Sequence, residues 1–167
     1  MRLLPLLTLI LTSVASAAPF LGSKVSFVTS AFCKANTCTH VATVPSGSLD
    51  QFHYDVAKRY RVVVWRYPSD VKRLGPSLVP YAGQVRGVGI TWYGLQDTPF
   101  GAETFAAQLM TFATGKATPA NTALKWLDAN GTQYVDWGNF QVAIEHAVLP
   151  GANAAMMSLT ASVNPFR

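Results

Sequence analysis

The chain has 167 residues, a formal net charge of +5, and 50% hydrophobic against 13% charged residues. This composition excludes an intrinsically disordered chain, because disorder accompanies low hydrophobicity and high charge. Between Ala18 and Arg86 nine basic side chains accompany three acidic ones, whereas three basic and five acidic side chains follow Arg86. This asymmetry is compatible with an anionic partner or with a solvated surface that keeps an exported protein dispersed.

The N-terminal segment has the organisation of a secretory signal peptide. Arg2 provides the positive start, Leu3 to Val14 the apolar stretch, and Ala15-Ser16-Ala17 the small-residue cleavage site. The apolar stretch is too short to cross about 30 Å of hydrocarbon, so we expect cleavage after Ala17 and no membrane anchor. The sequence therefore predicts an exported protein, periplasmic or extracellular, with residues 1–17 removed and residues 18–167 forming one domain.

Period-two alternation with many β-branched and aromatic residues predicts about five strands in the first half of this domain. Residues 57–59 form a turn between two of them, and 68–83, with three prolines, form a surface loop. Within that loop we expect at most one helical turn, from Asp70 to Leu74, with Ser69 as its cap. The predicted strands are 24–29, 39–44, 51–56, 60–67 and 84–94.

The apolar spacing then changes to three and four residues, which predicts two helices, 99–115 and 118–131. The first begins at Thr98-Pro99 or at Gly101 and ends at Gly115, and the second ends at Asn130-Gly131. A meander of three strands follows, with Gly138-Asn139 as a two-residue loop and a second turn at 150–153. The predicted strands of the meander are 132–137, 140–148 and 154–163.

Strands and helices that do not alternate regularly predict an antiparallel α+β domain. We expect the two helices to cover one face of the sheet, leaving the other face to solvent or to a ligand.

Cys33 and Cys38 are the only cysteines, and His40 follows them. Their spacing does not fit the C-x-x-C-H of a c-type haem, and a zinc site would lack a fourth ligand nearby and would need reduced thiolates. A redox pair requires C-x-x-C at a helix start, whereas these residues fall between two predicted strands. We therefore expect a structural disulfide on a hairpin, with no metal and no cofactor.

Catalytic motifs are missing: the sequence contains no H-E-x-x-H, G-x-S-x-G or G-x-x-x-x-G-K-[ST]. His146 shares the apolar parity of its strand, so it is a buried structural histidine or a pocket base oriented by Asp136 across the hairpin. His53 lies on a polar strand face beside Gln51 and Asp55, which predicts either a solvent-exposed face or the base of a hydrolase.

A basic and aromatic set of residues on the strands 60–67 and 84–94 is the best candidate for a binding surface. Two alternate glycines there remove side chains from a strip about 7 Å long, which allows a helix, a backbone or a ligand to approach closely. Arginines and aromatic rings beside it could hold phosphate, carboxylate or sugar groups. The predicted binding residues are Arg59, Arg61, Trp65, Arg86, Gly87, Gly89, Trp92 and Tyr93.

The sequence thus predicts an exported, non-catalytic binding or accessory protein that engages an anionic envelope polymer, a lipid head group or a protein. Nucleic acid is disfavoured, because an exported domain of modest charge rarely meets it. Two alternatives stay open: a hydrolase that uses His146 or His53 with an acid, and an assembly subunit that pairs through an exposed strand edge.

Overall fold

The computed structural model describes residues 18–94, 101–128, 131–148 and 155–163, without the side chains of 92–94, 146–148 and 155–157. The predicted signal peptide (1–17), the helix start at Thr98-Pro99 and the turn at 150–153 lie outside these ranges.

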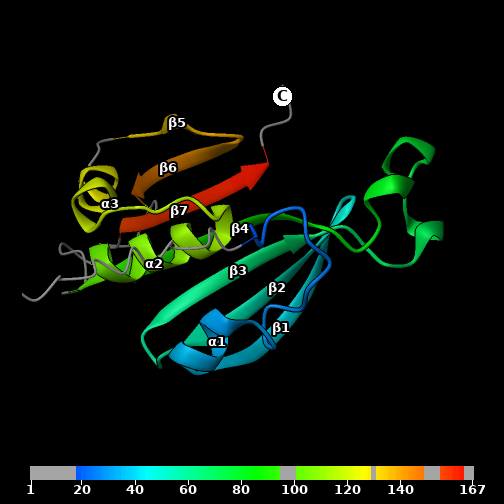
Figure 1. Ribbon diagram of the computed structural model, residues 1–167, viewed down its shortest axis with the longest axis horizontal. Helices are drawn as coiled ribbons and strands as arrows, with labels where there is room; N and C mark the ends of the chain where they lie inside the picture. Colours follow the sequence, from blue (N-terminus) through cyan, green and yellow to red (C-terminus); the bar gives the residue numbers. More distant parts are fainter. Residues whose placement is uncertain (1–17, 95–100, 129–130, 149–154, 164–167) are drawn as a thin grey trace, which may run out of the picture.

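The strands form one seven-stranded sheet in the order β1-β2-β3-β4-β7-β6-β5 (Figure 1). All neighbouring strands are antiparallel. β4, the strand that precedes the two larger helices in the chain, pairs with β7 in the middle of the sheet. The strands are β1 Cys38–Ser46, β2 Leu49–Val56, β3 Tyr60–Arg66, β4 Val85–Gly94, β5 Gln133–Trp137, β6 Phe140–Val148 and β7 Ala155–Val163.

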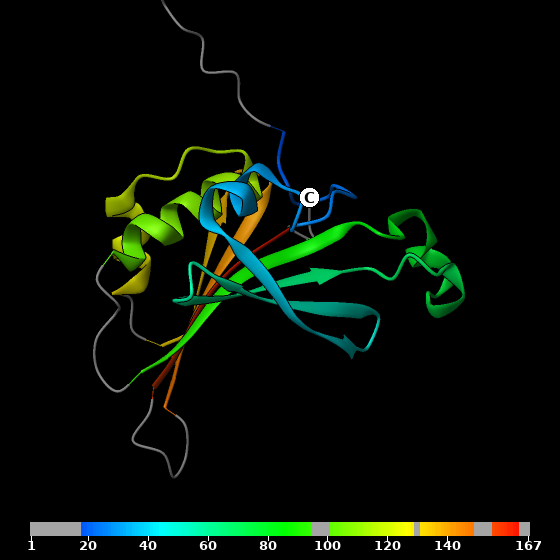
Figure 2. The same cartoon turned by 90° about the horizontal axis from the view of Figure 1, so that it is seen from below.

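Among the described residues, three helices lie on one face of this sheet, and both views of the ribbon show none of them on the opposite face (Figures 1 and 2). They are α1 Ala31–Asn36, α2 Ala102–Thr114 and α3 Ala120–Leu127. The predicted antiparallel α+β architecture is therefore confirmed, as are the two predicted helices and the uncovered sheet face.

The core lies between the sheet and the helices. Alternate residues of each strand point to the same face, so a strand contributes every second side chain to it. Tyr60 of β3, for example, stacks on Phe105 of α2 with ring centroids 4.0 Å apart. The largest fully buried side chains are Ile90, Leu109, Met110, Leu127, Ile144 and Leu159, together with Val56, Val62, Val85, Val88 and Val142.

The predicted strand at 24–29 is wrong, so the N-terminal half has four strands instead of about five. This segment is irregular, and only Phe27 is buried in it, among the rings of Phe20, Phe32 and Tyr54. The segment leads into α1, where the Oγ of Ser30 accepts a hydrogen bond from the backbone N–H of Cys33. A serine cap at this position favours a helix start, and that local hydrogen bond outweighs the strand-like alternation before it.

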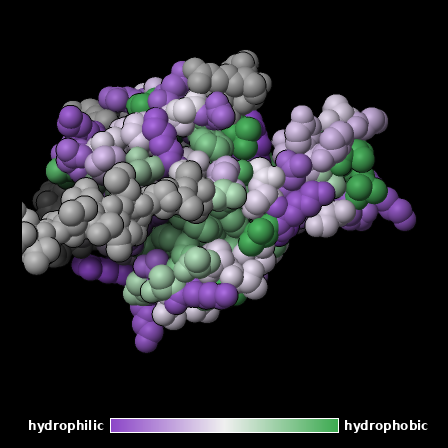
Figure 3. Space-filling model, viewed as in Figure 1, coloured by the Kyte–Doolittle hydropathy of each residue, from purple (hydrophilic) through white to green (hydrophobic). Residues whose placement is uncertain are grey.

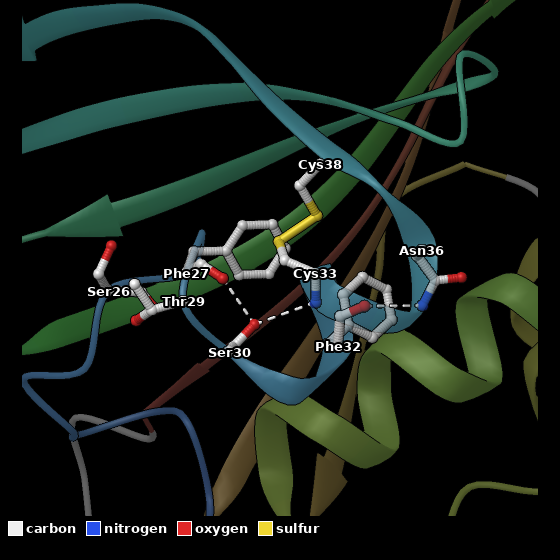
Figure 4. The surroundings of a disulfide bond; sticks show 8 residues. All are labelled: Ser26, Phe27, Thr29, Ser30, Phe32, Cys33, Asn36 and Cys38. Carbon is white, nitrogen blue, oxygen red and sulfur yellow. Dashed lines mark hydrogen bonds between the residues drawn. A yellow bond between two sulfur atoms is a disulfide. The ribbon is translucent and has the colours of Figure 1, made fainter.

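The Cys33–Cys38 disulfide is confirmed, but it does not clamp a hairpin. It joins the buried side of α1 to the first residue of β1, with the two Cα atoms 5.0 Å apart (Figure 4). Its role is therefore to fasten α1 to the edge of the sheet.

The β2–β3 turn is conformationally unusual. Ala57 and Lys58 both have left-handed backbone angles, with φ of 52° and 56°. Such consecutive positive angles are typical of a type I′ hairpin turn, in which Asn-Gly is the favoured pair. The N–H of Ala57 donates to the carbonyl of Asn36 at 3.0 Å, so the end of α1 holds this turn.

The β3–β4 connection, residues 68–83, forms an arm that projects beyond the ends of the strands (Figures 1 and 2). Its two 3₁₀ turns, Val71–Arg73 and Pro76–Tyr81, contain no buried residue, and the first is capped by Asp70 rather than by Ser69. An ion pair between Arg73 and the buried Asp50 fixes the arm, with N–O distances of 2.7 and 3.0 Å. In the described ranges, no helix is long and apolar enough to span a bilayer.

Candidate binding surface

The sheet face opposite the helices is the candidate binding surface, and we call it the open face. The strand register brings the side chains of six strands into continuous rows across it. These rows contain mostly hydroxyl, amide and small side chains, and nearly all are partly exposed. Three successive rows are Asp55-Arg61-Thr91-Ser158-Glu145, His53-Val63-Gly89-Thr160-Ala143-Tyr134 and Gln51-Trp65-Gly87-Ser162-Gln141-Asp136.

Trp65 lies across the two predicted glycines at the centre of this face. A Cβ atom added to Gly89 would be 2.9 Å from Cζ3 and 3.0 Å from Cη2 of the indole, and one added to Gly87 would be 3.4 Å from Cε3. The space that the sequence predicts for a helix, a backbone or a ligand is therefore taken by the ring of Trp65. The result is an aromatic platform rather than an empty groove.

The platform has an available hydrogen-bond donor. The indole Nε1 of Trp65 has no hydrogen-bond partner in the described part of the chain. The only described side-chain nitrogen or oxygen that is both buried and unpartnered is Nε1 of Trp137, so Nε1 of Trp65 reaches solvent. Trp65 thus offers an apolar ring and a polar N–H at the same place.

The charges of the open face do not make it basic. Nε of Arg61 is 2.7 Å from Oδ1 of Asp55, so this pair is close to neutral. Glu145 of β6 adds a negative charge to the same face. Partial burial, the nearby Arg61 and His40 together lower the pKa of His53, which favours its neutral form.

The structure separates the predicted basic residues instead of gathering them. Arg86 lies at a register shift between β3 and β4, so the pairing does not assign it to the open face, and its guanidinium donates to the carbonyl of Val163. Arg59 is exposed in the β2–β3 turn. Of the predicted binding residues with described side chains, Arg61, Trp65, Gly87 and Gly89 share the open face. The side chains of Trp92 and Tyr93 lie outside the description, although their backbones pair with β7.

The strand register separates the backbones of Asp136 and His146, and His53 has no described carboxylate partner. The register places Asp136 opposite Gln141, five residues along β6 from His146, which corresponds to about 17 Å at roughly 3.4 Å per residue. The side chain of His146 itself is not described. His53 makes no hydrogen bond or ion pair with a described carboxylate, and Nε2 of His40 contacts Oγ1 of Thr43 at 3.0 Å.

Metal ligation finds no support either within the described ranges, which contain no cluster of three His, Cys, Asp or Glu side chains placed to hold an ion. The chemistry that the open face offers is hydrogen bonding and ring stacking.

Sequence reasoning missed the hydroxyl row of β7. Ser158, Thr160 and Ser162 alternate with the buried Leu159 and Ala161, so all three hydroxyls lie on the open face. The alternation in SLTAS is visible in the sequence, but only the pairing of β7 with β4 places it beside Gly87 and Gly89.

The β1 edge of the sheet is poorly suited to pairing with a partner strand. β1 is nine residues long and mostly exposed, but a register shift between His40 and Ala42 and a proline at position 45 interrupt it. Bulges and prolines on edge strands oppose pairing with another chain. The described geometry therefore gives little support to assembly through this edge.

Comparisons of the chain with protein-family models, with curated proteins and with solved structures each returned no match.

Proposed function

We propose that the protein is exported and acts as a non-catalytic binding protein whose open face holds an uncharged, hydroxyl-rich polymer such as an envelope polysaccharide. The observation that carries the proposal is the partly exposed indole of Trp65, lying on Gly87 and Gly89 among hydroxyl and amide side chains. The signal-like N-terminal segment and the Cys33–Cys38 disulfide support export, because disulfides persist in oxidising compartments.

The residues of the open face favour a sugar over the phosphate or carboxylate ligands that the sequence also allows. A sugar ring has an apolar C–H face that can lie on an indole, and its hydroxyls both donate and accept hydrogen bonds. The side chains of Thr160, Ser162 and Gln141 can form hydrogen bonds with these hydroxyls, because they lie in the same row as Trp65 or in the adjacent row. Free cationic donors, which an anion would require, are missing among the described side chains of this face, because Arg61 is paired with Asp55.

Binding is tested by retention on insoluble polysaccharides, with chitin and cellulose as the uncharged probes and peptidoglycan sacculi as the anionic comparison. Trp65→Ala should weaken retention about ten-fold, which corresponds to the loss of one favourable ring contact. Tyr81→Ala is the matched control, since it removes a 48% exposed aromatic ring from the arm instead of the open face. Circular dichroism establishes that both variants are folded.

Three results would count against the proposal: no retention of the wild-type protein on any of the polysaccharides, equal losses in Trp65→Ala and Tyr81→Ala, or retention only on anionic polymers.

A further inference from the structure

Three exposed positive charges lie together at the corner where α1 meets the β2–β3 turn. Lys34, Lys58 and Arg59 are all exposed, and none of their charged side-chain groups has a hydrogen-bond or ion-pair partner among the described residues. We call these three residues the basic corner. Hydrophilic side chains lie over this region at the lower margin of the view in Figure 3.

The other arginines of the described chain are already engaged. Arg61 and Arg73 pair with carboxylates, whereas Arg66 and Arg86 donate to backbone carbonyls. Asp55 is the nearest acid along the hairpin, and it is bound to Arg61. The basic corner therefore keeps its full positive charge.

The backbone holds the three charges together. The N–H of Ala57 donates to the carbonyl of Asn36, two residues after Lys34. With consecutive Cα atoms about 3.8 Å apart, this hydrogen bond keeps the Cα atoms of Lys34 and Lys58 within about 16 Å of each other. The charges are close enough for one surface to contact all three.

Lys58 occupies its position against its own backbone preference. Its φ of 56° lies in the left-handed region, where glycine or asparagine would be less strained. Glycine at this position would relieve the strain, so a glycine variant can separate the charge of Lys58 from its backbone conformation.

We propose that the basic corner anchors the protein to the phosphate head groups of an anionic lipid surface. Three long, exposed cations on a projecting corner do not enclose a single ion, but each can contact a different head group of a bilayer. Such contacts are electrostatic, add up approximately with the number of basic residues, and weaken with salt. Export would place the protein where it meets such a surface, and the open face is a separate site.

The test uses the exported protein, with its N-terminus defined by intact mass, and co-sedimentation with vesicles. The vesicles contain phosphatidylglycerol and phosphatidylcholine in one series and phosphatidylcholine alone in the other. Each charge removed by Lys34→Gln, Lys58→Gln or Arg59→Gln should lower the partition coefficient about five-fold at low salt, and the triple variant about 100-fold.

Two glycine variants separate charge from backbone strain. Lys58→Gly relieves the strain and removes the charge, so it should be more stable and bind vesicles more weakly. Ala57→Gly relieves the neighbouring strain at φ of 52° but keeps the charge, so it should be more stable and bind as the wild type does. Lys125→Gln removes an exposed lysine of α3 and should leave binding unchanged.

The proposal is overturned by equal binding to both kinds of vesicle or by no binding to either. It is also overturned if Lys125→Gln loses as much as Lys58→Gln, because total charge would then explain the effect. Displacement by millimolar inorganic phosphate at constant ionic strength would identify a discrete phosphate site and would overturn the lipid surface as the ligand.

Discussion

Gly89→Ala tests whether the glycines of β4 are required by the ring of Trp65. The added methyl carbon would lie 2.5 Å from Oγ1 of Thr160 and 2.9 Å from Cζ3 of Trp65. Both distances are shorter than van der Waals contact, so a side chain or the backbone must move. Overpacking of this kind costs about 1–3 kcal/mol, partly offset by about 0.4–1 kcal/mol from the smaller entropy of the unfolded chain. We expect the free energy of unfolding to fall by about 1–2 kcal/mol.

Gly87→Ala is the matched control on the same strand and the same face. Its added carbon would be 3.4 Å from the nearest atom, Cε3 of Trp65, which is an ordinary contact. The entropic gain should then dominate, so this variant should be as stable as the wild type or about 0.5 kcal/mol more stable. Neither glycine has a positive φ, so backbone strain does not enter the comparison.

Urea denaturation followed by circular dichroism measures both variants, and a double-mutant cycle identifies the cause. With Trp65→Leu in the background, Gly89→Ala should cost about 1 kcal/mol less than it does in the wild type, because the shorter side chain leaves room. A Gly89→Ala variant no less stable than Gly87→Ala, or a cost independent of Trp65, would refute the packing of Trp65 on Gly89.

Three other predictions concern parts of the molecule outside the platform. Replacing Cys33 and Cys38 by serine should lower the free energy of unfolding by about 2 kcal/mol, as expected for so short a loop; an equal stability of the oxidised wild type and the double variant would contradict this. Asp50→Asn should loosen the arm by removing the charge that Arg73 binds, and limited proteolysis should then cut between residues 68 and 83 several-fold faster than in the wild type; unchanged cleavage would mean that the ion pair does not fix the arm. Because the pKa of His53 is lowered on folding, its contribution to stability is complete above pH 6.5 and declines as the pH falls towards the folded-state pKa; His53→Gln should reduce the loss of stability below pH 6.5, and an unaltered pH profile would exclude this contribution.

Much of the fold could be predicted because it depends on local periodicity. Alternation identified seven strands, and the change to a spacing of three and four identified α2 and α3. The one wrongly predicted strand, 24–29, has the same alternation as the true strands. The prediction is wrong because Ser30 starts a helix immediately after this segment. The sequence did not predict α1 at all, because a helix of six residues is too short to show a helical periodicity.

The candidate surface depended on information that the sequence does not hold. Alternation determines which residues of one strand share a face, so the sequence by itself grouped Arg61 with Trp65, and Gly87 with Gly89. Only the tertiary structure decided which of these groups lie together, because a shift of one residue in strand pairing moves a whole set of side chains to the other face. The observed register unites those two groups with the hydroxyls of β7, whereas Arg86 falls at a register shift and joins neither group. It also pairs Arg61 with Asp55, so the basic and aromatic surface that the sequence predicts becomes an aromatic platform whose arginine is already engaged.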